Sequence, residues 1–572
     1  MKNNHSIVLI FSFIIGASLF VFPQAPILSG QAENVPANHP IYQFLKRMEV
    51  KKIISQYHDA VLPLSRKEIA QFILQIENNK EELTETERYI LDDFLIEFEY
   101  ELHRSTENSF SLFGKGDDVV SGMVRGTFHD QEKHIYTYSD SIVNFFSDGL
   151  LTLDYRRSRG NGMNDKAIFL DGGLRLRGSV YDRLGYYLQL TNAQFWGSRD
   201  VLKRDKRISQ SYALGTTDSK NFDFVEGYLR YSGGIISAEL GRERILWGNS
   251  YGTKLILSDY PRVYDAVRFD AEYKNIKYTF LHAWILGKKD RLFLNPSYGY
   301  EPIVADKYFA AHRLEFSFGK SVDMGIQEIT IYSNRSVDLG YLNPITFFES
   351  VQRSREERDN GYLAFDIQMR PVPGFELQGT LFYDDIHIPL FGKNRWENRY
   401  AWQLGLMSVD PLDISNTNFM VEYTRVEPYM FAHNRSREND YGSNKILLGT
   451  QIGPNAESWF FKLDYYFTHR LNLSTSFEII RSGENVYDST GMLIKNVGGD
   501  FLQPFRIGDN IYKEFLGGAR HKTLVSQAYL TYEVMNEIFL DFRYQWMWKK
   551  NQSQNYKLFE QHDYGCALRI DF

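Results

Sequence analysis

The chain ends in DYGCALRIDF, residues 563–572, and the side chains of this stretch alternate in character. One face of an extended strand carries Tyr564, Cys566, Leu568, Ile570 and Phe572. The opposite face carries Asp563, Gly565, Ala567, Arg569 and Asp571. Because successive side chains of a strand point to opposite sides, the stretch predicts a strand with one face suited to lipid and one suited to water.

The same period of two recurs along residues 118–572, with clear runs at 267–273, 363–370 and 541–548. Strands that are long, apolar outside and polar inside are typical of transmembrane barrels. An alternating last strand that ends in phenylalanine is similar to the assembly signal of bacterial outer-membrane barrels. The resemblance implies that Tyr564, Leu568, Ile570 and Phe572 form this barrel assembly signal. The sequence therefore predicts an all-β transmembrane antiparallel barrel.

The links between strands are of two kinds, as expected for a barrel with short periplasmic turns and long outer loops. Short links occur at 181–183, 232–234, 274–275, 371–374 and 535–537. Long polar links occur at 197–221, 287–305, 335–361, 386–397, 427–442 and 483–521. Strands counted forward from residue 118 and backward from residue 572 place the link 483–521 at opposite ends of the barrel. Either that loop hides a strand or a segment near 443–481 does not span, so we predict 18–22 strands.

The first 32 residues predict a secretory signal peptide. Lys2 precedes an apolar run from Ile7 to Phe22, which is too short for a usual membrane helix and is followed by Pro23. Small residues then allow cleavage after Ala32. An N-terminal membrane anchor is the alternative interpretation. We expect a mature chain that is exported to the bacterial outer membrane.

Residues 33–112 have an apolar period near 3.6 and predict a small periplasmic α-helical bundle. Two stretches, Ser65 to Glu68 and Thr84 to Glu87, match the capping box, in which Ser or Thr and a Glu three residues later satisfy the first turn of a helix. An amphipathic apolar stripe follows each box. The apolar side chains are expected to form the bundle core rather than a ligand groove.

Composition excludes several classes of function. The 65 basic and 72 acidic residues leave no basic excess for nucleic-acid binding. A single cysteine excludes a disulfide framework. The chain has no His-Glu-x-x-His motif and no phosphate-binding loop. We therefore expect no catalysis, no cofactor and no metal.

Three long links contain apolar and aromatic residues that would be unfavourable in water. They are Gly241 to Ser258, Tyr341 to Phe348, and a third that runs from Glu422 through His433 to Pro454. We expect these segments to fold into the barrel mouth. Trp247-Gly248, Asn343-Pro344 and Glu422-Tyr423-Thr424, in this order, resemble the Wzi-type capsule-assembly proteins. The resemblance covers roughly 118–572 and implies an outer-membrane barrel with a preceding periplasmic helical element. It also implies a lectin-like role without turnover.

The resemblance implies that the protein binds or organises surface capsular polysaccharide at the cell exterior. A sugar site needs aromatic faces for stacking and planar polar side chains for hydroxyl groups. The candidate ligand-binding residues are Arg242, Arg244, Trp247, Tyr251, Glu422 and Arg425. The same residues could instead plug the lumen and pair with each other. A porin or substrate-specific channel and an outer-membrane enzyme are the alternative functions. The expected partners are surface polysaccharide, outer-membrane lipids and the barrel assembly machinery, with no nucleic acid.

Overall fold

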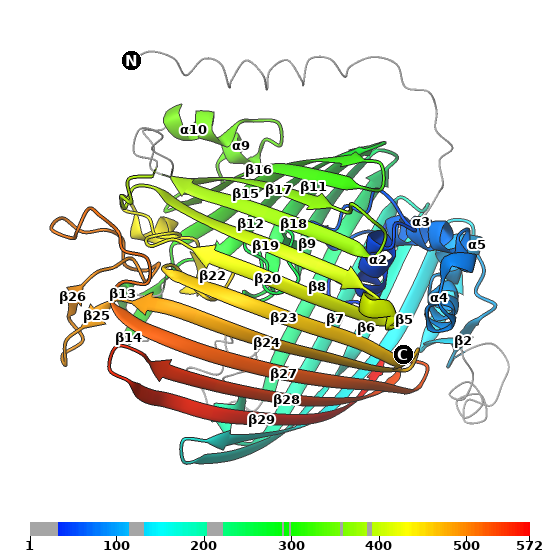
Figure 1. Cartoon of the computed structure of the whole chain (residues 1–572). Helices are drawn as coiled ribbons and strands as arrows, with labels where there is room; N and C mark the ends of the chain where they lie inside the picture. The colour runs from blue at the N-terminus through cyan, green and yellow to red at the C-terminus, as the bar shows by residue number, and fades with distance from the viewer. Residues whose placement is uncertain are drawn as a thin grey trace.

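The computed structural model describes residues 32–113, 131–202, 221–288, 291–296, 299–354, 359–385 and 392–571. Within these residues, eighteen long strands close into one antiparallel barrel (Figure 1). They are β5 (Val143–Gly160), β6 (Met163–Val180), β7 (Leu184–Gly197), β8 (Asn221–Gly233), β9 (Ile236–Glu243), β11 (Tyr264–Tyr273), β12 (Ile276–Leu286), β15 (Asp306–Phe318), β16 (Val322–Ser333), β17 (Asn360–Met369), β18 (Phe375–Asp385), β19 (Arg399–Val409), β20 (Thr417–Val426), β23 (Ala456–Thr468), β24 (Leu471–Glu484), β27 (Ala519–Met535), β28 (Ile538–Asn551) and β29 (Tyr556–Asp571). The pairing of β29 with β5 closes the barrel.

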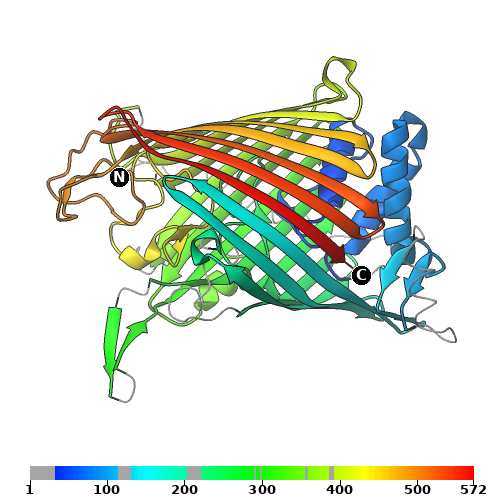
Figure 2. The same cartoon turned by 90° about the horizontal axis from the view of Figure 1, so that it is seen from below.

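The two ends of the barrel differ (Figure 2). At one end, here called the helical end, short turns join the strands, as between β6 and β7 or between β27 and β28, and the N-terminal helices lie across the opening. At the other end, the loop end, most of the links are long. Small elements within the links are α7 (Arg199–Leu202), β13 (Arg291–Asn295), β14 (Gly299–Ile303), α9 (Leu339–Leu342), α10 (Phe348–Ser354), β25 (Val486–Tyr487) and β26 (Leu493–Lys495).

The alternation of side chains predicted for the last strand is confirmed. Tyr564, Cys566 and Leu568 are exposed on the outer face of β29, and Ala567 between them is buried. Phe572 lies outside the described residues. Cys566 therefore lies among residues that face lipid, where it acts as a small apolar side chain.

The ambiguity over 483–521 is resolved by a segment that does not span. β24 and β27 are antiparallel neighbours, so the residues between them form a loop-end connection with no hidden barrel strand. The segment that does not span lies just before β23, within the predicted stretch 443–481. There, β21 (Gly442–Ser443) and β22 (Ile446–Leu447) form a small separate hairpin and do not join the barrel.

The N-terminal region forms the predicted helices. They are α2 (Ile41–Val50), α3 (Arg66–Glu77), α4 (Glu85–Glu97) and the short α5 (Glu99–His103). Both predicted capping boxes are present, at Ser65 with Glu68 and at Thr84 with Glu87. The apolar faces pack into a core of their own that includes Phe44, Leu45 and Ile73.

No helix in the described part of the chain is long and apolar enough to cross a bilayer.

The helices contact the barrel closely. The Arg47 guanidinium on α2 bonds Asp410 in the turn between β19 and β20, at 2.7 Å, and Asn418 at the start of β20, at 2.7 Å. Farther along, β1 (Val61–Leu62) pairs with β10 (Leu246–Trp247), which belongs to a loop-end link. On the opposite side, β2 (Ser109–Ser111) pairs with β3 (Glu132–His134), and β4 (Tyr136–Ser139) pairs with β5. A link from the loop end thus reaches the helical bundle through the lumen.

Candidate functional site

The link between β9 and β11 runs inside the barrel. Trp247 has no exposed surface, and its backbone exchanges two hydrogen bonds of 3.0 Å with Leu257. The Trp247 indole N–H donates to the Gln327 side chain on the inner face of β16. These contacts fold residues 244–263 into a compact loop that stands in the lumen, as the apolar sequence predicted.

Glu422, on the inner face of β20, fixes the tip of this loop. Its carboxylate accepts hydrogen bonds from the backbone N–H groups of Tyr251 and Gly252, at 2.9 and 3.3 Å, and from the Ser250 hydroxyl at 2.9 Å. The Tyr251 hydroxyl donates to Glu376 on β18 at 2.8 Å. Burial and the neighbouring Glu376 raise the pKa of that hydroxyl well above its usual range, so it stays a neutral donor.

A second link, between β20 and β23, packs on the first from the side of the loop end. The backbone carbonyl of Leu448 accepts from the Ser258 N–H at 2.8 Å. A Cβ atom on Gly449 would lie 2.0 Å from the Leu255 carbonyl oxygen, so only glycine permits this approach. We call residues 244–263 and 427–455 together the lumen plug.

The lumen plug has an apolar core that is continuous with the inner wall of the barrel. Its own buried members are Ile245, Trp247, Leu255, Ile256, Leu257, Met430, Phe431, Tyr441, Leu447 and Leu448. The wall contributes Phe309, Ile329, Ile331, Tyr362, Phe382 and Ala401. A wet channel would need polar lining here. This side of the barrel is packed like a protein interior.

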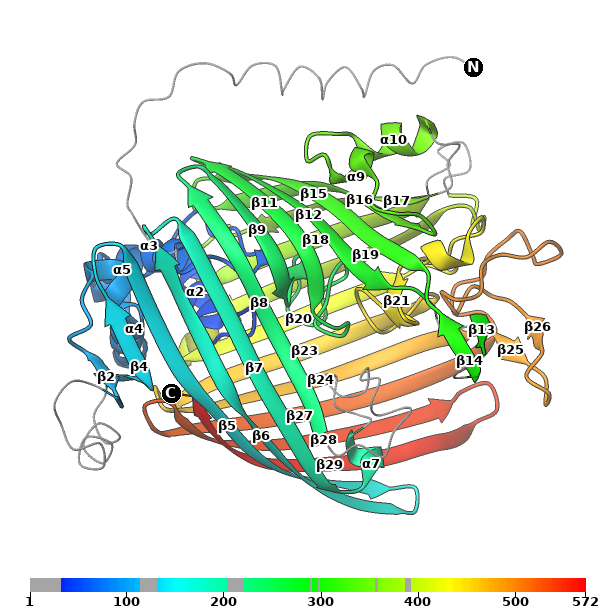
Figure 3. The same cartoon turned by 180° about the vertical axis from the view of Figure 1, so that it is seen from behind.

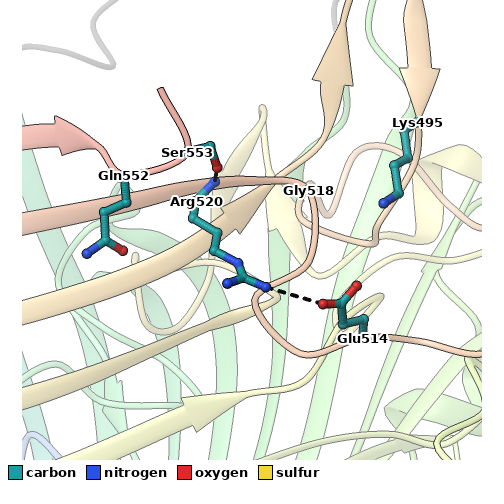
Figure 4. Close-up of a pocket in the computed structure, with 6 residues that line it drawn as sticks. All are labelled: Lys495, Glu514, Gly518, Arg520, Gln552 and Ser553. Atoms are coloured by element: carbon teal, nitrogen blue, oxygen red, sulfur yellow. Dashed lines mark hydrogen bonds and ion pairs between the residues drawn. The ribbon is translucent and has the colours of Figure 1, made fainter. Parts of the chain in front are cut away.

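At the loop end, the links after β24 and β28 form a polar depression of about 560 Å³ (Figure 4). Its lining residues are Lys495, Glu514, Gly518, Arg520, Gln552 and Ser553. Arg520 is held at both ends, because its backbone N–H donates to the Ser553 hydroxyl at 2.9 Å and its guanidinium meets Glu514 at 3.3 Å. The β25–β26 hairpin that carries Lys495 also exposes Tyr487, and the same link exposes Tyr512. We call this surface the loop-end pocket.

Comparison with known proteins agrees with the geometry. The family model described as capsule assembly protein Wzi matches residues 76–555, which is most of the chain. The chain belongs to the Wzi capsule assembly family. The resemblance predicted from its three loop blocks is therefore confirmed, and the barrel is that of an outer-membrane protein.

Solved structures with the same architecture include Wzi of Escherichia coli, described as an outer-membrane protein involved in group 1 capsule assembly and a carbohydrate-binding β-barrel. It is 12% identical, with a TM-score of 0.56, and the match covers 95% of this chain and 100% of that one. OprD of Pseudomonas aeruginosa is 10% identical, with a TM-score of 0.39, over 75% of this chain and 95% of its own. No curated protein matches the chain.

This Wzi family member brings only two of the six predicted site residues into direct contact. Glu422 on β20 binds the backbone N–H of Tyr251 at the tip of the lumen plug. Trp247 lies in the same loop but belongs to its apolar core, where its indole bonds Gln327. Arg244 lies near the start of the plug, half-buried, where its charge acts on Glu226 of β8. The predicted meeting of Arg242 and Arg425 with the others is wrong.

Strand parity explains the error. Arg242 lies on the outer face of β9 and pairs with the exposed Asp265 at 2.6 Å. Arg425 pairs with Glu427 at 2.7 Å and covers the Phe515 ring at 3.7 Å. Residues 422 and 425 are three apart on one strand, so their side chains point to opposite sides of the wall.

The expected position of the second loop block is also corrected. Residues 341–348 of this Wzi family member do not enter the barrel mouth. They lie against the outer wall, where Tyr341 and Phe348 pack on the outward side chains Phe280, Tyr308 and Tyr332.

The tip of the lumen plug contains a sequence pattern that also occurs in hydrolases. Residues 248–252 have the spacing Gly-x-Ser-x-Gly, which marks the nucleophile elbow of many hydrolases. That elbow needs a strand–turn–helix context and a histidine base. Here the Ser250 hydroxyl donates to the Glu422 carboxylate, in a loop that follows a two-residue strand. Among the described residues, no cluster of three or more His, Cys, Asp or Glu side chains could hold a metal ion.

Sequence reasoning missed the loop-end pocket. Its residues come from three separate stretches of the chain, so they share no local spacing. The available signal was the presence of Tyr487, Ile507 and Tyr512 in a polar link, since all three remain exposed in the folded Wzi family member.

Proposed function

We propose that this Wzi family member binds surface polysaccharide at its loop-end pocket and holds the polymer at the cell exterior without turnover. One observation carries the proposal: the chain's own lumen plug packs against one side of the barrel interior, whereas a polar depression with exposed tyrosines is open at the loop end. The solved E. coli relative is described as carbohydrate-binding, which supports the same class of ligand.

The orientation follows from the ends of the barrel. The predicted signal peptide would export the chain, and short turns and both termini normally lie on the periplasmic side of such barrels. The domain limits that we propose are 1–32 for the signal peptide, 33–112 for a periplasmic helical domain and 118–572 for the barrel. The loop-end pocket would then face the outside of the cell.

The chemistry of the pocket favours an acidic polymer. Lys495 and Arg520 place two cations beside one acid, Glu514. A guanidinium can bind a sugar carboxylate through two parallel hydrogen bonds, and a serine hydroxyl or glutamine amide can bond ring hydroxyls. The exposed rings of Tyr487 and Tyr512 on the same link would add stacking surfaces.

The proposal predicts that Arg520→Ala and Lys495→Ala cells assemble the barrel normally but shed polymer into the medium. Polymer on cells and in medium would be measured by sugar analysis, and assembly by the heat-modifiable migration of the barrel. The matched control is Lys393→Ala, which removes an exposed cation from another loop-end link. Retention equal to wild type in both pocket variants would remove the pocket from consideration.

The lumen residues that the sequence singled out take a different role in this proposal. Trp247, Tyr251 and Glu422 would close the lumen and brace the loops above it rather than touch polymer. Variants at these positions should therefore change barrel stability first, and polymer retention only as a consequence.

A further inference from the structure

The link between β16 and β17 folds back along the outside of the barrel. α9 and α10 lie over the outer wall near the loop end, as views from both sides agree (Figures 1 and 3). Beneath them, the outward side chains Phe280, His282 and Tyr332 are 2%, 0% and 0% exposed. Farther along the same outer faces, Trp284 and Met324 are 43% and 44% exposed. We call residues 334–354 the outer cover.

The outer cover shields two ionisable groups on the outer face of the wall. His312 and Glu328 are cross-strand partners on β15 and β16, and their side chains meet at 3.0 Å. A polar pair there would be costly in contact with acyl chains. The cover bonds the acid of this pair, because the Glu328 carboxylate accepts from the backbone N–H groups of Phe348 and Glu349, at 3.0 and 2.6 Å. The Phe348 ring stacks on His312 with centroids 4.5 Å apart.

Aromatic and charged contacts fix the cover on the wall. The Tyr332 hydroxyl accepts the Asp338 N–H at 3.1 Å, and the Tyr332 and Tyr341 rings lie 5.0 Å apart. Arg335 binds Asp359 through two hydrogen bonds of 2.8 and 2.6 Å. The cover is therefore a built part of the fold, and its outer surface has a defined composition.

That outer surface is apolar where it turns away from the barrel. Leu339, Ile345 and Phe347 are 78%, 81% and 41% exposed. The polar pair Glu349 and Arg353 lies on α10, joined at 2.8 Å and open to solvent. An apolar side and a charged side on one small element are the pattern of segments that lie at a membrane surface.

The position of the cover identifies what meets its apolar side. One row of outward cross-strand partners runs Phe269, Phe280, His312, Glu328 and Leu363. Leu363, beside the covered pair, is 37% exposed and belongs to the lipid-facing band. The outer cover therefore lies over part of a row of outward side chains that would otherwise face lipid. Its own apolar side chains take the place of those wall side chains at the outer surface.

We propose that the outer cover is embedded in the outer leaflet of the membrane, with Leu339, Ile345 and Phe347 in contact with lipid acyl chains. Glu349 and Arg353 then lie toward the headgroups. The inference concerns membrane contact and does not depend on polymer binding at the loop-end pocket.

The test places a polarity-sensitive fluorophore on the cover. Ile345→Cys is made in a Cys566→Ser background, labelled, and reconstituted into phosphatidylcholine vesicles with or without spin-labelled acyl chains. The expected result is strong quenching by the spin-labelled lipid and weak quenching by aqueous iodide. A label on the native Cys566, which already faces outward, is the lipid-exposed reference. Leu339→Cys provides a second position, and Glu349→Cys is the matched polar control on the same element.

Two results would overturn the proposal. Iodide quenching at Ile345 and Leu339 equal to that at Glu349 would place the apolar side in water. Disulfide formation between Ile345→Cys chains at low protein-to-lipid ratio would show that a second copy of the chain covers it instead. The side chain is 81% exposed, so the substitution leaves the wall contacts of the cover in place.

Discussion

At the scale of single residues, the face of the wall on which a side chain lies decides what it does. Trp247 has the largest of the fully buried side chains, and it anchors the lumen plug to β16 through Gln327. Trp247→Ala should cost on the order of 3–5 kcal/mol, because it removes an indole from a packed core and leaves a cavity. The measurement is the temperature at which the folded barrel loses its compact migration in a gel. Arg242→Ala is the control, since its exposed pair with Asp265 contributes little.

Leu568 tests the outer face in the same way. It is 37% exposed beside Cys566 on the lipid-facing side of β29. Leu568→Arg should cost about 2–4 kcal/mol if the position lies near the bilayer midplane, and it should reduce membrane assembly. Arg569→Lys, one residue later on the inner face, should assemble normally. Wild-type yields of heat-modifiable barrel from Leu568→Arg would contradict the lipid-facing assignment.

At the scale of elements, the sequence predicted the helices and their caps well. It predicted poorly on which side of the barrel wall each long link lies. The capping boxes at Ser65 and Thr84 were readable because cap and helix are neighbours in the chain. Apolar loop residues show that a link needs cover, yet they do not show which side of the wall provides it. The block around Trp247 entered the lumen, whereas the block around Tyr341 packed outside.

The binding surface was the hardest to predict. The loop-end pocket joins Lys495, Arg520 and Ser553, which only the closed barrel brings together. No spacing within one segment encodes that meeting. The expected grouping of Arg242 and Arg425 with the other candidate residues failed for a simpler reason. Residues near strand ends were grouped without regard to which face of the wall they occupy.

The docking of α2 on the barrel gives an element-scale prediction. Arg47 is 3% exposed and bonds Glu87 at 2.6 Å and Asp410 at 2.7 Å. Arg47→Met should destabilise the docked helices by about 2–3 kcal/mol, because it removes charge-assisted hydrogen bonds to two acids. Glu87 keeps Lys51 at 2.7 Å, whereas Asp410 loses its bond to α2. Limited proteolysis within residues 80–103 of the detergent-solubilised protein would measure this. Arg88→Met on α4 loses only local hydrogen bonds to the Lys80 and Glu81 carbonyl groups in the preceding turn, so it should have little effect.

The same site predicts a pH dependence. Burial opposes ionisation of Glu87, but Arg47 and Lys51 outweigh it and hold its pKa below the usual glutamate range. A carboxylate with a depressed pKa in the folded state stabilises docking above its unfolded pKa, and that contribution is lost as the pH falls through the folded value. Protease sensitivity of wild type should therefore rise as the solution becomes acidic. Glu87→Gln should be less stable at neutral pH and should show a smaller change on acidification.

At the scale of the whole molecule, two closures stand in series along the barrel axis. The helical end is covered by α2–α5 and by the contacts around β3, where Tyr100 packs on Phe146 at 5.5 Å and Arg177 covers the same ring. The lumen plug forms the second closure, and β1 with β10 joins the two. On the other side of the lumen, the inner faces of β27–β29 stay partly exposed, as at Tyr529 and Arg569. Water therefore reaches this side of the interior.

The two closures predict a measurement that distinguishes a polysaccharide-binding barrel from an open channel. Barrels of this strand number are wide enough to leave an aqueous pore unless something fills them. Purified protein in a planar bilayer should therefore carry no large, steady current. Replacing residues 245–262 with a short Gly-Ser link removes β10, Trp247 and the tip held by Glu422, so current should rise in correctly assembled barrels. Arg242→Ala, on the outer face, should leave current unchanged. A large steady conductance in wild type would show that the barrel is an open channel. No rise in conductance in the link variant would show that residues 245–262 do not block the lumen.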